Sequence, residues 1–356
     1  MKNIITSLIW FFLLSIPSAF VYSQSTADSL LNFIKQNKER ASLYLKKNDT
    51  ITATLNENKL MPLASTVKII VAIEFAKQAA HNTFNKNEKI PLNELNKYYI
   101  PNTDGGAHPR WINYEKTLGN IINGSVKLID VARGMIIFSS NANTEYLMDL
   151  LGIDKIQNNI QLLGLKKHTP IYPLVSSLFL YQNPRKINED KIIRVIKRLS
   201  NEDYAKSALL IHNQLKNDSN YKKKFRPQDL TLKMQKEWSD RLPASTTKEY
   251  VQLCSTLNNR KYFDSSTYQV LAEVLESLME VPANKVWLAH AGMKGGSTMF
   301  VLTKALYATL KNGTKIEMAY FFNDLTGEEN MRLQMWMNNF EIRVLTDEKF
   351  RKQMVF

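Results

Sequence analysis

The segment PLASTVKIIVAIEFA, residues 62–76, begins with a short polar stretch and continues as an almost unbroken apolar run. The spacing predicts a helix over residues 68–80 that is apolar on nearly every side and is therefore buried. Ser65 and Lys68 lie three positions apart, which places both side chains on one face of a helix. A lysine with little water around it has a lowered pKa and can accept the proton of a serine hydroxyl. The segment is thus interpreted as a core helix that carries a candidate nucleophile and its base.

The pattern Ala-Ser-Thr-x-Lys occurs a second time, in LPASTTKEYVQLCST, residues 242–256. Here Thr246 is followed three residues later by Glu249, which is typical of a capped helix start. Lys248 is expected to be solvated in this setting. The second copy therefore indicates the start of a helix, and Ser65 rather than Ser245 is the candidate nucleophile.

Away from these two segments, the predicted elements divide by type along the chain. Helical patterns dominate from residue 65 to about residue 280, and strands are predicted on either side of this block. The predicted strands cover residues 41–47, 51–56, 286–290, 298–310 and 315–323. The pattern predicts an α/β (α+β) chain, with one sheet built from both chain ends, flanked by helices over residues 25–40 and 328–344, and an all-helical lobe at about residues 65–285.

The first 23 residues have the pattern of a secretory signal peptide. Lys2 precedes an apolar run over residues 4–20, and Ser23 is a small residue at a plausible cleavage point. The run is somewhat long, so an uncleaved anchor is the alternative. No cysteine follows the run, which argues against a bacterial lipid anchor. The expectation is an exported protein, periplasmic or extracellular, that begins near Gln24 and has no stable membrane insertion after cleavage.

The chain has 356 residues, 44% hydrophobic content and a formal net charge of +14. Much of the positive charge lies between Arg185 and Lys248. Such a face could meet nucleic acid or an anionic cell envelope. No nucleic-acid motif or stacking aromatic residue accompanies these lysines, so a solvated helical surface is preferred and no nucleic-acid partner is expected. The one cysteine, Cys254, excludes an internal disulfide and is expected to be buried among apolar neighbours.

Two further motifs follow Ser65 and Lys68 in chain order. Ser139-Ser140-Asn141 follows a predicted helix over residues 128–138, and Lys294-Gly295-Gly296-Ser297 lies between two predicted strands. Ser-x-x-Lys, Ser-x-Asn and Lys-x-Gly in this order resemble the serine β-lactamase and penicillin-binding protein superfamily. The segment SSNANTEYLMDLLG, residues 139–152, is similar to the class A branch. Each motif alone is weak evidence for this superfamily, whereas the three motifs together in this order are specific to it.

The resemblance covers most of residues 24–356. It implies one catalytic domain of the β-lactamase/transpeptidase-like fold, with an antiparallel sheet. It also implies a role for each matching residue. Ser65 is the acylated nucleophile, Lys68 its general base, and Ser139 a relay for the proton to the leaving nitrogen; Lys294 supports Ser139 and the substrate carboxylate. The substrate-binding residues implied are Asn141, Gly296, Ser297, Thr298 and Trp111. The backbone N–H groups of Ser65 and Ser297 form the oxyanion hole.

Structural interpretations of the same residues remain open. Ser139 and Asn141 could serve only as helix caps, and Gly295-Gly296 could be a strand bulge. The loop YYIPNTDGGAHPRW, residues 98–111, rims the active site in the family's layout, where Asp104, His108 and Trp111 could touch substrate. The alternative is an ordinary loop with packed aromatic side chains. The histidines show no ligand spacing, so neither a metal nor a cofactor is expected.

The sequence also departs from the class A pattern. Gly295 supplies no hydroxyl for a substrate carboxylate, a role that Ser297 or Thr298 could take. No Asp or Glu lies between Asp154 and Glu189, where class A enzymes place the carboxylate that activates the deacylating water. Asp104 is a remote substitute. The spacing between the second and third motifs is also long, and the excess falls in an inserted basic helical stretch at about residues 185–240.

The function expected from these observations is a secreted, class A β-lactamase-related serine hydrolase that acts through an acyl-serine on β-lactam or related amide bonds. The alternatives are a cell-wall D,D-peptidase or an esterase of the same fold, and a non-catalytic envelope binding protein. The expected partner is a small β-lactam or a peptidoglycan-type peptide, and a monomer is expected.

Overall fold

The computed structural model describes residues 20–356, and the predicted signal peptide, residues 1–23, lies almost entirely outside this range. The described chain forms two compact units. We call Val67–Ala244 the helical unit, and residues 20–66 together with Ser245–Phe356 the sheet unit. Residues 245–285, which the predicted helical lobe included, thus belong to the sheet unit. No helix among residues 20–356 combines the length and the apolar character needed to cross a membrane.

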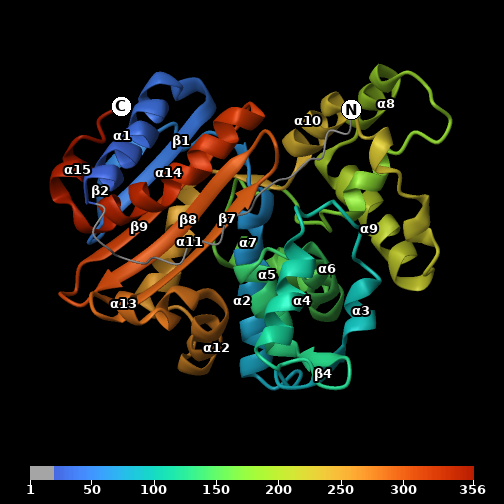
Figure 1. Cartoon of the computed structure of the whole chain (residues 1–356), viewed down its shortest axis with the longest axis horizontal. Helices are drawn as coiled ribbons and strands as arrows, with labels where there is room; N and C mark the ends of the chain where they lie inside the picture. Colours follow the sequence, from blue (N-terminus) through green and yellow to red (C-terminus); the bar gives the residue numbers. More distant parts are fainter. Residues whose placement is uncertain (1–19) are drawn as a thin grey trace. The chain divides into compact units, whose positions relative to one another are not determined.

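The sheet unit is built on a five-stranded antiparallel sheet with the order β2-β1-β9-β8-β7 (Figure 1). Its strands are β1 (Ala41–Lys47), β2 (Thr50–Leu55), β7 (Leu288–Ser297), β8 (Leu302–Leu310) and β9 (Lys315–Phe322). β1 pairs with β9 from Ala41↔Phe322 to Lys47↔Ile316, so the early and late parts of the chain meet in the sheet. The predicted sheet from both chain ends is confirmed.

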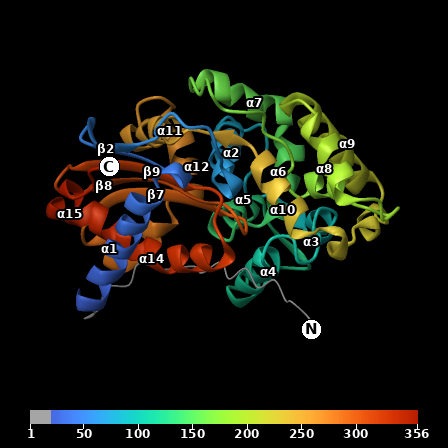
Figure 2. The same cartoon turned by 90° about the horizontal axis from the view of Figure 1, so that it is seen from above.

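Helices cover both faces of this sheet (Figure 2). α1 (Phe20–Gln36) and α14 (Gly327–Thr346) lie on one face, and α11 (Thr247–Asn259) lies on the other. Side chains alternate along β9, so that Tyr320 contacts Phe340 of α14 while Phe321 contacts Tyr250 of α11. A strand covered on both faces is largely apolar, which explains the run IEMAYFF in β9, where the buried Glu317 is the exception.

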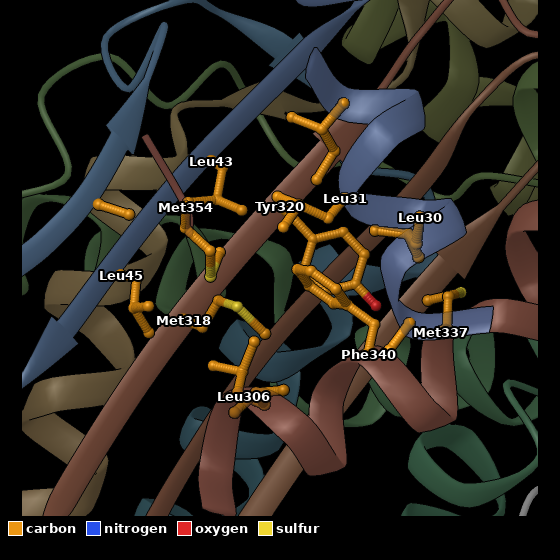
Figure 3. Close-up of a cluster of buried hydrophobic side chains, with 14 of the residues drawn as sticks. Leu30, Leu31, Leu43, Leu45, Leu306, Met318, Tyr320, Met337, Phe340 and Met354 are labelled. Atoms are coloured by element: carbon orange, nitrogen blue, oxygen red, sulfur yellow. The ribbon is translucent and has the colours of Figure 1, made fainter. Parts of the chain in front are cut away.

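The core of the sheet unit lies between α1, the sheet and α14 (Figure 3). Leu30 of α1, Leu43 of β1 and Phe340 of α14 are fully buried there, and Met318 and Tyr320 of β9 lie between them. α14 begins with a capping box in which Thr326 and Glu329 satisfy each other's backbone N–H groups. The smaller elements of this unit include η1 (Lys38–Arg40), β3 (Met61–Pro62), α12 (Ser265–Leu275), η6 (Ser277–Glu280), α13 (Pro282–Lys285) and α15 (Glu348–Lys352), and η2 (Ala64–Val67), which contains Ser65, ends at the unit boundary.

The helical unit is organised around α2 (Lys68–Ala80), which has the bounds that the sequence predicts. Nearly all of its residues are buried, because α5, α6 and α7 pack against it. The other elements are α3 (Leu92–Asn96), α4 (Ala107–Thr117), α5 (Leu128–Ile137), α6 (Asn141–Leu151), α7 (Ile153–Leu162), η3 (Ser176–Tyr181), α8 (Glu189–Lys197), α9 (Asn201–Asn217), η4 (Tyr221–Lys224), η5 (Pro227–Asp229), α10 (Leu232–Arg241) and the paired short strands β4 (Lys89–Pro91) and β5 (Ser125–Lys127).

The strand that carries the third motif differs from the prediction. The sequence predicts a strand that ends at residue 290, whereas β7 continues to Ser297. Gly295 and Gly296 stay in the ladder and pair with Lys304 and Thr303 of β8. The irregularity in this pairing lies between Leu288 and His290 instead, so the glycine pair is neither a turn nor a bulge.

Candidate active site

Lys68 of the first motif lies at the first position of α2 and is fully buried. Its Nζ lies 2.8 Å from the carbonyl oxygen of Ser139, 2.7 Å from Oδ1 of Asn141 and 3.4 Å from Oγ of Ser139. Burial lowers the pKa of the Lys68 ammonium from 10.5 to about 7, against the opposing effect of the charges on Asp104 and Glu145. A large fraction of Lys68 is therefore a neutral amine near pH 7, which is the form that can accept a proton.

The second motif meets Lys68 through a strained turn between α5 and α6. Ser139 has φ +66°, a left-handed conformation that is uncommon for a residue with a side chain. Ser140 is the N-cap of α6, and its hydroxyl accepts the backbone N–H of Asn143 at 3.2 Å. Asn141 is the first residue of that helix. The cap and the turn together place the Ser139 carbonyl and the Asn141 side chain against Lys68, so capping and lysine contact coexist in this motif.

His108 of α4 contacts the same turn through Ser140 and Asn143. Its Nδ1 lies 2.9 Å from Oγ of Ser140 and 3.2 Å from Oδ1 of Asn143. Burial lowers the pKa of the His108 imidazole to about 4, so it is neutral at pH 7. Nε2 of His108 has no hydrogen-bond partner among the described residues. An unpaired N–H at this buried position would cost more free energy than an unpaired nitrogen lone pair. The proton is therefore assigned to Nδ1, and His108 donates a hydrogen bond to the second motif.

The two carboxylates whose charges reach Lys68 are already bound by other donors. Asp104 accepts the backbone N–H groups of Gly106, Ala107 and His108 at 2.9–3.1 Å, so it anchors the start of α4. Glu145 is buried in α6, where its Oε1 accepts the N–H groups of residues 175 and 176 and its Oε2 accepts the Ser176 hydroxyl at 2.6 Å. Both carboxylates are therefore held in place by donors within the helical unit.

Ser65 lies in the sheet unit, just before the boundary that separates it from Lys68. It is half-buried and follows Ala64, whose φ of +45° is left-handed and strained. The turn is fastened to β8 by Thr303, whose hydroxyl donates to the carbonyl oxygen of Leu63 at 2.7 Å and lies 2.8 Å from the hydroxyl of Thr66. The backbone around Ser65 is thus held in a conformation that a free chain avoids.

The third motif lies beside this turn within the sheet unit. A Cβ atom on Gly296 would lie 2.5 Å from both the carbonyl oxygen of Leu63 and the backbone nitrogen of Ser65, so only glycine fits there. Gly295 is different, since its added Cβ would have no neighbour closer than 3.4 Å. Lys294 is buried, and its Nζ donates to the carbonyl oxygen of Gly295 at 2.8 Å.

The turn after the third motif is held by α14. Nδ2 of Asn330 donates to the carbonyl oxygen of Thr298 at 2.8 Å and to that of Val301 at 3.2 Å. Ser297 and Thr298 themselves are half-buried. Three residues that hold the motifs in place are not predicted as such from the sequence: Asn330, Thr303 and His108. Each contacts a motif that is distant in sequence, so no local pattern marks the contact. Only His108 stands in a segment, residues 98–111, that the sequence singles out.

Trp111 is placed in the core of the helical unit rather than at an accessible surface. It is fully buried, its Nε1 donates to Glu115 at 3.0 Å, and a Cβ on Gly134 would lie 2.5 Å from that nitrogen. Its ring also lies 5.4 Å from that of His108. The loop over residues 98–111 therefore matches the packed-aromatic alternative, and the expectation that Trp111 touches substrate has no support from its position.

The second Ala-Ser-Thr-x-Lys copy is a helix start, as predicted. The hydroxyl of Thr246 accepts the backbone N–H of Glu249 at 3.1 Å, and Lys248 is exposed. The Glu249 carboxylate accepts the hydroxyl of Ser245 at 2.6 Å rather than completing a capping box. Cys254 of the same helix is buried, and burial raises the pKa of its thiol, which confirms its expected place in the core.

Within residues 20–356, no group of three His, Cys, Asp or Glu side chains is arranged to hold a metal ion. The two motif clusters present hydroxyl, amine, amide and backbone groups. The helical unit brings Lys68, Ser139 and Asn141 together, and the sheet unit brings the Ser65 backbone together with Gly296.

The chain is similar in structure to several solved β-lactamases. A class A β-lactamase from Bacteroides cellulosilyticus is 13% identical, with a TM-score of 0.52 over 91% of this chain and 99% of that chain. β-Lactamases from Chitinophaga pinensis (16% identity, TM-score 0.53, 90% and 97% coverage) and Sphaerobacter thermophilus (14% identity, TM-score 0.55, 90% and 96% coverage) share the same fold. No curated protein sequence matches the chain.

A family model described as the β-lactamase enzyme family matches residues 25–258. The match includes the first and second motifs and ends before the third. The match extends over more than half of the chain, and the fold agrees with it. The protein belongs to the β-lactamase enzyme family.

Proposed function

We propose that this protein is an exported serine hydrolase that cleaves β-lactams or related amides through an acyl-Ser65 intermediate. The observation that carries the proposal is the environment of Lys68, a fully buried amine with a pKa of about 7, three residues after a serine on a strained turn. Burying a lysine without a carboxylate partner is costly for folding, so a use for its neutral form explains why it is there.

In the proposed reaction, the neutral amine of Lys68 takes the proton of the Ser65 hydroxyl as its oxygen attacks the carbonyl carbon. The backbone N–H groups of Ser65 and Ser297 stabilise the oxyanion, which requires the close approach that Gly296 permits. Ser139 donates its hydroxyl proton to the leaving nitrogen and takes the proton held by Lys68, 3.4 Å away, as the C–N bond breaks. Lys294 supports Ser139 and the substrate carboxylate.

Asn141 is proposed to bind the substrate's amide side chain while it also accepts a hydrogen bond from Lys68. Ser297 and Thr298, at the end of β7, are proposed to replace the hydroxyl that Gly295 lacks. Both lie in the turn that Asn330 fixes, so their hydroxyls are held at defined positions. Trp111 is left out of this proposal because it is fully buried.

Deacylation is proposed to be slow. Asp104 and Glu145 are bound by other donors, and no acidic residue lies between Asp154 and Glu189. Lys68, which is neutral again once Ser139 has protonated the leaving nitrogen, is then the base available to the deacylating water, and no carboxylate assists it. A long-lived acyl-enzyme favours the second candidate function, a cell-wall D,D-peptidase or esterase of the same fold.

Intact-protein mass spectrometry with a fluorescent penicillin tests the proposal, using the wild type, Ser65→Ala and, as a matched control, Ser245→Ala. We expect a covalent adduct on the wild type and on Ser245→Ala, and none on Ser65→Ala. An adduct that persists for minutes indicates a peptidase-like enzyme, and rapid loss with accumulating product indicates a β-lactamase.

If penicillin gives neither adduct nor product, a fluorophosphonate is the second probe. Labelling of Ser65 by the fluorophosphonate alone would overturn β-lactam recognition and keep the serine hydrolase. Absence of covalent labelling by both probes would favour a non-catalytic binding protein.

A further inference from the structure

The surface of α8, in the inserted basic stretch, combines exposed cations with exposed aliphatic side chains. Lys191, Arg194, Val195 and Arg198 follow the spacing i, i+3, i+4, i+7 and so form one stripe along the helix. All four are exposed, and Val195 has 58% of its surface accessible. The opposite side of α8 is apolar and buried, through Ile193 and Ile196 and their neighbours. A helix face that only meets water would carry polar side chains throughout, whereas this stripe has an exposed valine between cations.

The residues beside the stripe extend the same character. Arg185, Lys186 and Ile187 precede α8 in a turn closed by Asn183, and all three are exposed. Leu232, at the start of α10, is 60% exposed. It lies beside the first turn of α8, because its two chain neighbours both bind that turn (Figure 1). We define the α8 surface as Arg185, Lys186, Ile187, Lys191, Arg194, Val195, Arg198 and Leu232.

The acidic residues of this region make no ion pair with the cations of the α8 surface. Glu189 accepts the hydroxyl of Thr231, and Asp190 pairs with Lys233, so both point to α10. Lys197, off the stripe, pairs with Glu237 of α10 at 3.3 Å. None of the cations of the α8 surface has a carboxylate within ion-pair distance among the described residues, and Arg194 bonds only a backbone carbonyl. The cations of the α8 surface are thus available to an external anion.

We propose that the α8 surface docks on an anionic lipid bilayer, lying on the headgroups without crossing them. Cations on the polar face of a short amphipathic helix are attracted to anionic headgroups, and the aliphatic side chains between them enter the headgroup boundary. A nucleic acid fits less well, since the α8 surface has no aromatic side chain on which a base could stack. The inference concerns a surface distinct from the motif residues and does not depend on the proposed acyl-serine chemistry.

The experiment is sedimentation of the full chain with large vesicles of phosphatidylcholine alone or with 30% phosphatidylglycerol, in low and physiological salt. We expect binding to the anionic vesicles alone, weakened at least about tenfold by Lys191→Glu/Arg194→Glu. The matched control is Lys116→Glu/Lys248→Glu, which changes two exposed lysines elsewhere and gives the same net charge. A third variant, Ile187→Ser/Val195→Ser, should weaken the binding that survives in physiological salt.

Circular dichroism melts establish that each variant is folded. Equal weakening by the control pair would overturn the proposal, since net charge alone would then explain binding. So would binding to soluble heparin, sensitive to the α8 variants, together with failure to bind the anionic vesicles, because the partner would then be an anionic polymer. Ser65→Ala protein should bind vesicles as the wild type does, so this result stands apart from any failure of the proposed hydrolase.

Discussion

The Cβ atom that Gly296 lacks would lie 2.5 Å from the backbone nitrogen of Ser65. Real Cβ atoms do not approach backbone that closely, so the strand with the third motif and the turn with the candidate nucleophile can touch only through a glycine. Within the sheet unit, this contact links two motifs that are far apart in sequence. It also explains why the two glycines of β7 differ: Gly296 has no room for a side chain, whereas Gly295 has.

Gly296→Ala should therefore move the Ser65 turn away from β7. A displacement near 1 Å costs roughly 100-fold in reactions that depend on positioned groups, and we expect a loss of that order in the rate of Ser65 labelling. Gly295→Ala is the matched control, because its Cβ meets nothing closer than 3.4 Å and should leave labelling within about twofold. Equal loss in both variants would show that β7 tolerates no side chain at all and would contradict the asymmetry.

Gly295→Ser should improve β-lactam acylation. The position has room for a side chain, and the added hydroxyl would supply the carboxylate contact that the third motif lacks. Stopped-flow acylation by a fluorescent penicillin measures the effect, and one new hydrogen bond to a charged group predicts a gain of about tenfold. Gly295→Ala separates the hydroxyl from the added carbon. No gain from serine over alanine would mean that Ser297 and Thr298 already fill this role.

The rate of Ser65 labelling should follow the deprotonation of Lys68. Its neutral form is the base, so the rate should rise from pH 5 to pH 8 with a midpoint near 7, where burial places the pKa. Labelling by a fluorophosphonate across this range gives the profile. A rate that is flat over the range, or that falls as the pH rises, would exclude Lys68 as the base.

Stability should depend on pH through the same lysine. The unfolded chain holds a proton on Lys68 up to pH 10.5, whereas the folded chain releases it near pH 7. The unfolded state thus binds more protons between these values, and the free energy of unfolding should rise with pH across this interval. Lys68→Met should lose this contribution, so urea unfolding of both proteins from pH 7 to 9.5 should show a steeper rise in the wild type.

Acid should destabilise the helical unit through two neutral histidines, the buried His108 and the half-buried His168. Burial lowers the pKa of both His108 and His168 from 6.5 to about 4. Both stay neutral when folded while the unfolded chain takes up protons, so stability is retained above pH 6.5 and is lost as the pH falls toward 4. His108→Asn keeps a donor to Ser140 and removes one titration. It should shrink the loss between pH 6.5 and 4 by on the order of 3 kcal/mol relative to wild type.

The same histidine position also tests support of the second motif. His108→Ala removes the donor to Ser140 and Asn143, whereas His108→Asn retains one. We expect the alanine variant to shift the midpoint of the Lys68-dependent labelling profile, because Ser139 and Asn141 lose their support, and the asparagine variant to restore it. A profile unchanged in His108→Ala would limit His108 to packing.

Much of the fold follows from local patterns in the sequence. α2 has its predicted bounds because its apolar run begins at a polar turn and ends at a polar residue, and β1, β9 and α14 lie close to their predicted ranges. Continuous apolar runs mark elements covered on both sides, and here they are long enough to be assigned. The predicted sheet from both chain ends follows from where these elements stand in the sequence.

The errors and omissions have one physical cause, which is contact over long sequence separation. Two adjacent glycines favour a turn locally, but Gly296 lies within β7 because the Ser65 turn packs on it. Thr303 is an ordinary strand residue in the sequence, and only the fold brings it to Leu63. Trp111 stands in a loop-like segment, yet its ring packs against Gly134 of α5, which takes it into the core.

The pairing of β1 with β9 also has a consequence for how the protein is made. A ribosome releases β1 and β2 early, and β9 emerges only after the whole helical unit has been synthesised. Until then β1 has an open edge and an apolar face, which are the features that lead a nascent chain to associate with other chains. The open edge of β1 is therefore covered only once β9, the last strand to be translated, has been synthesised. A truncated product that ends before residue 315 should be a substrate for chaperones and proteases.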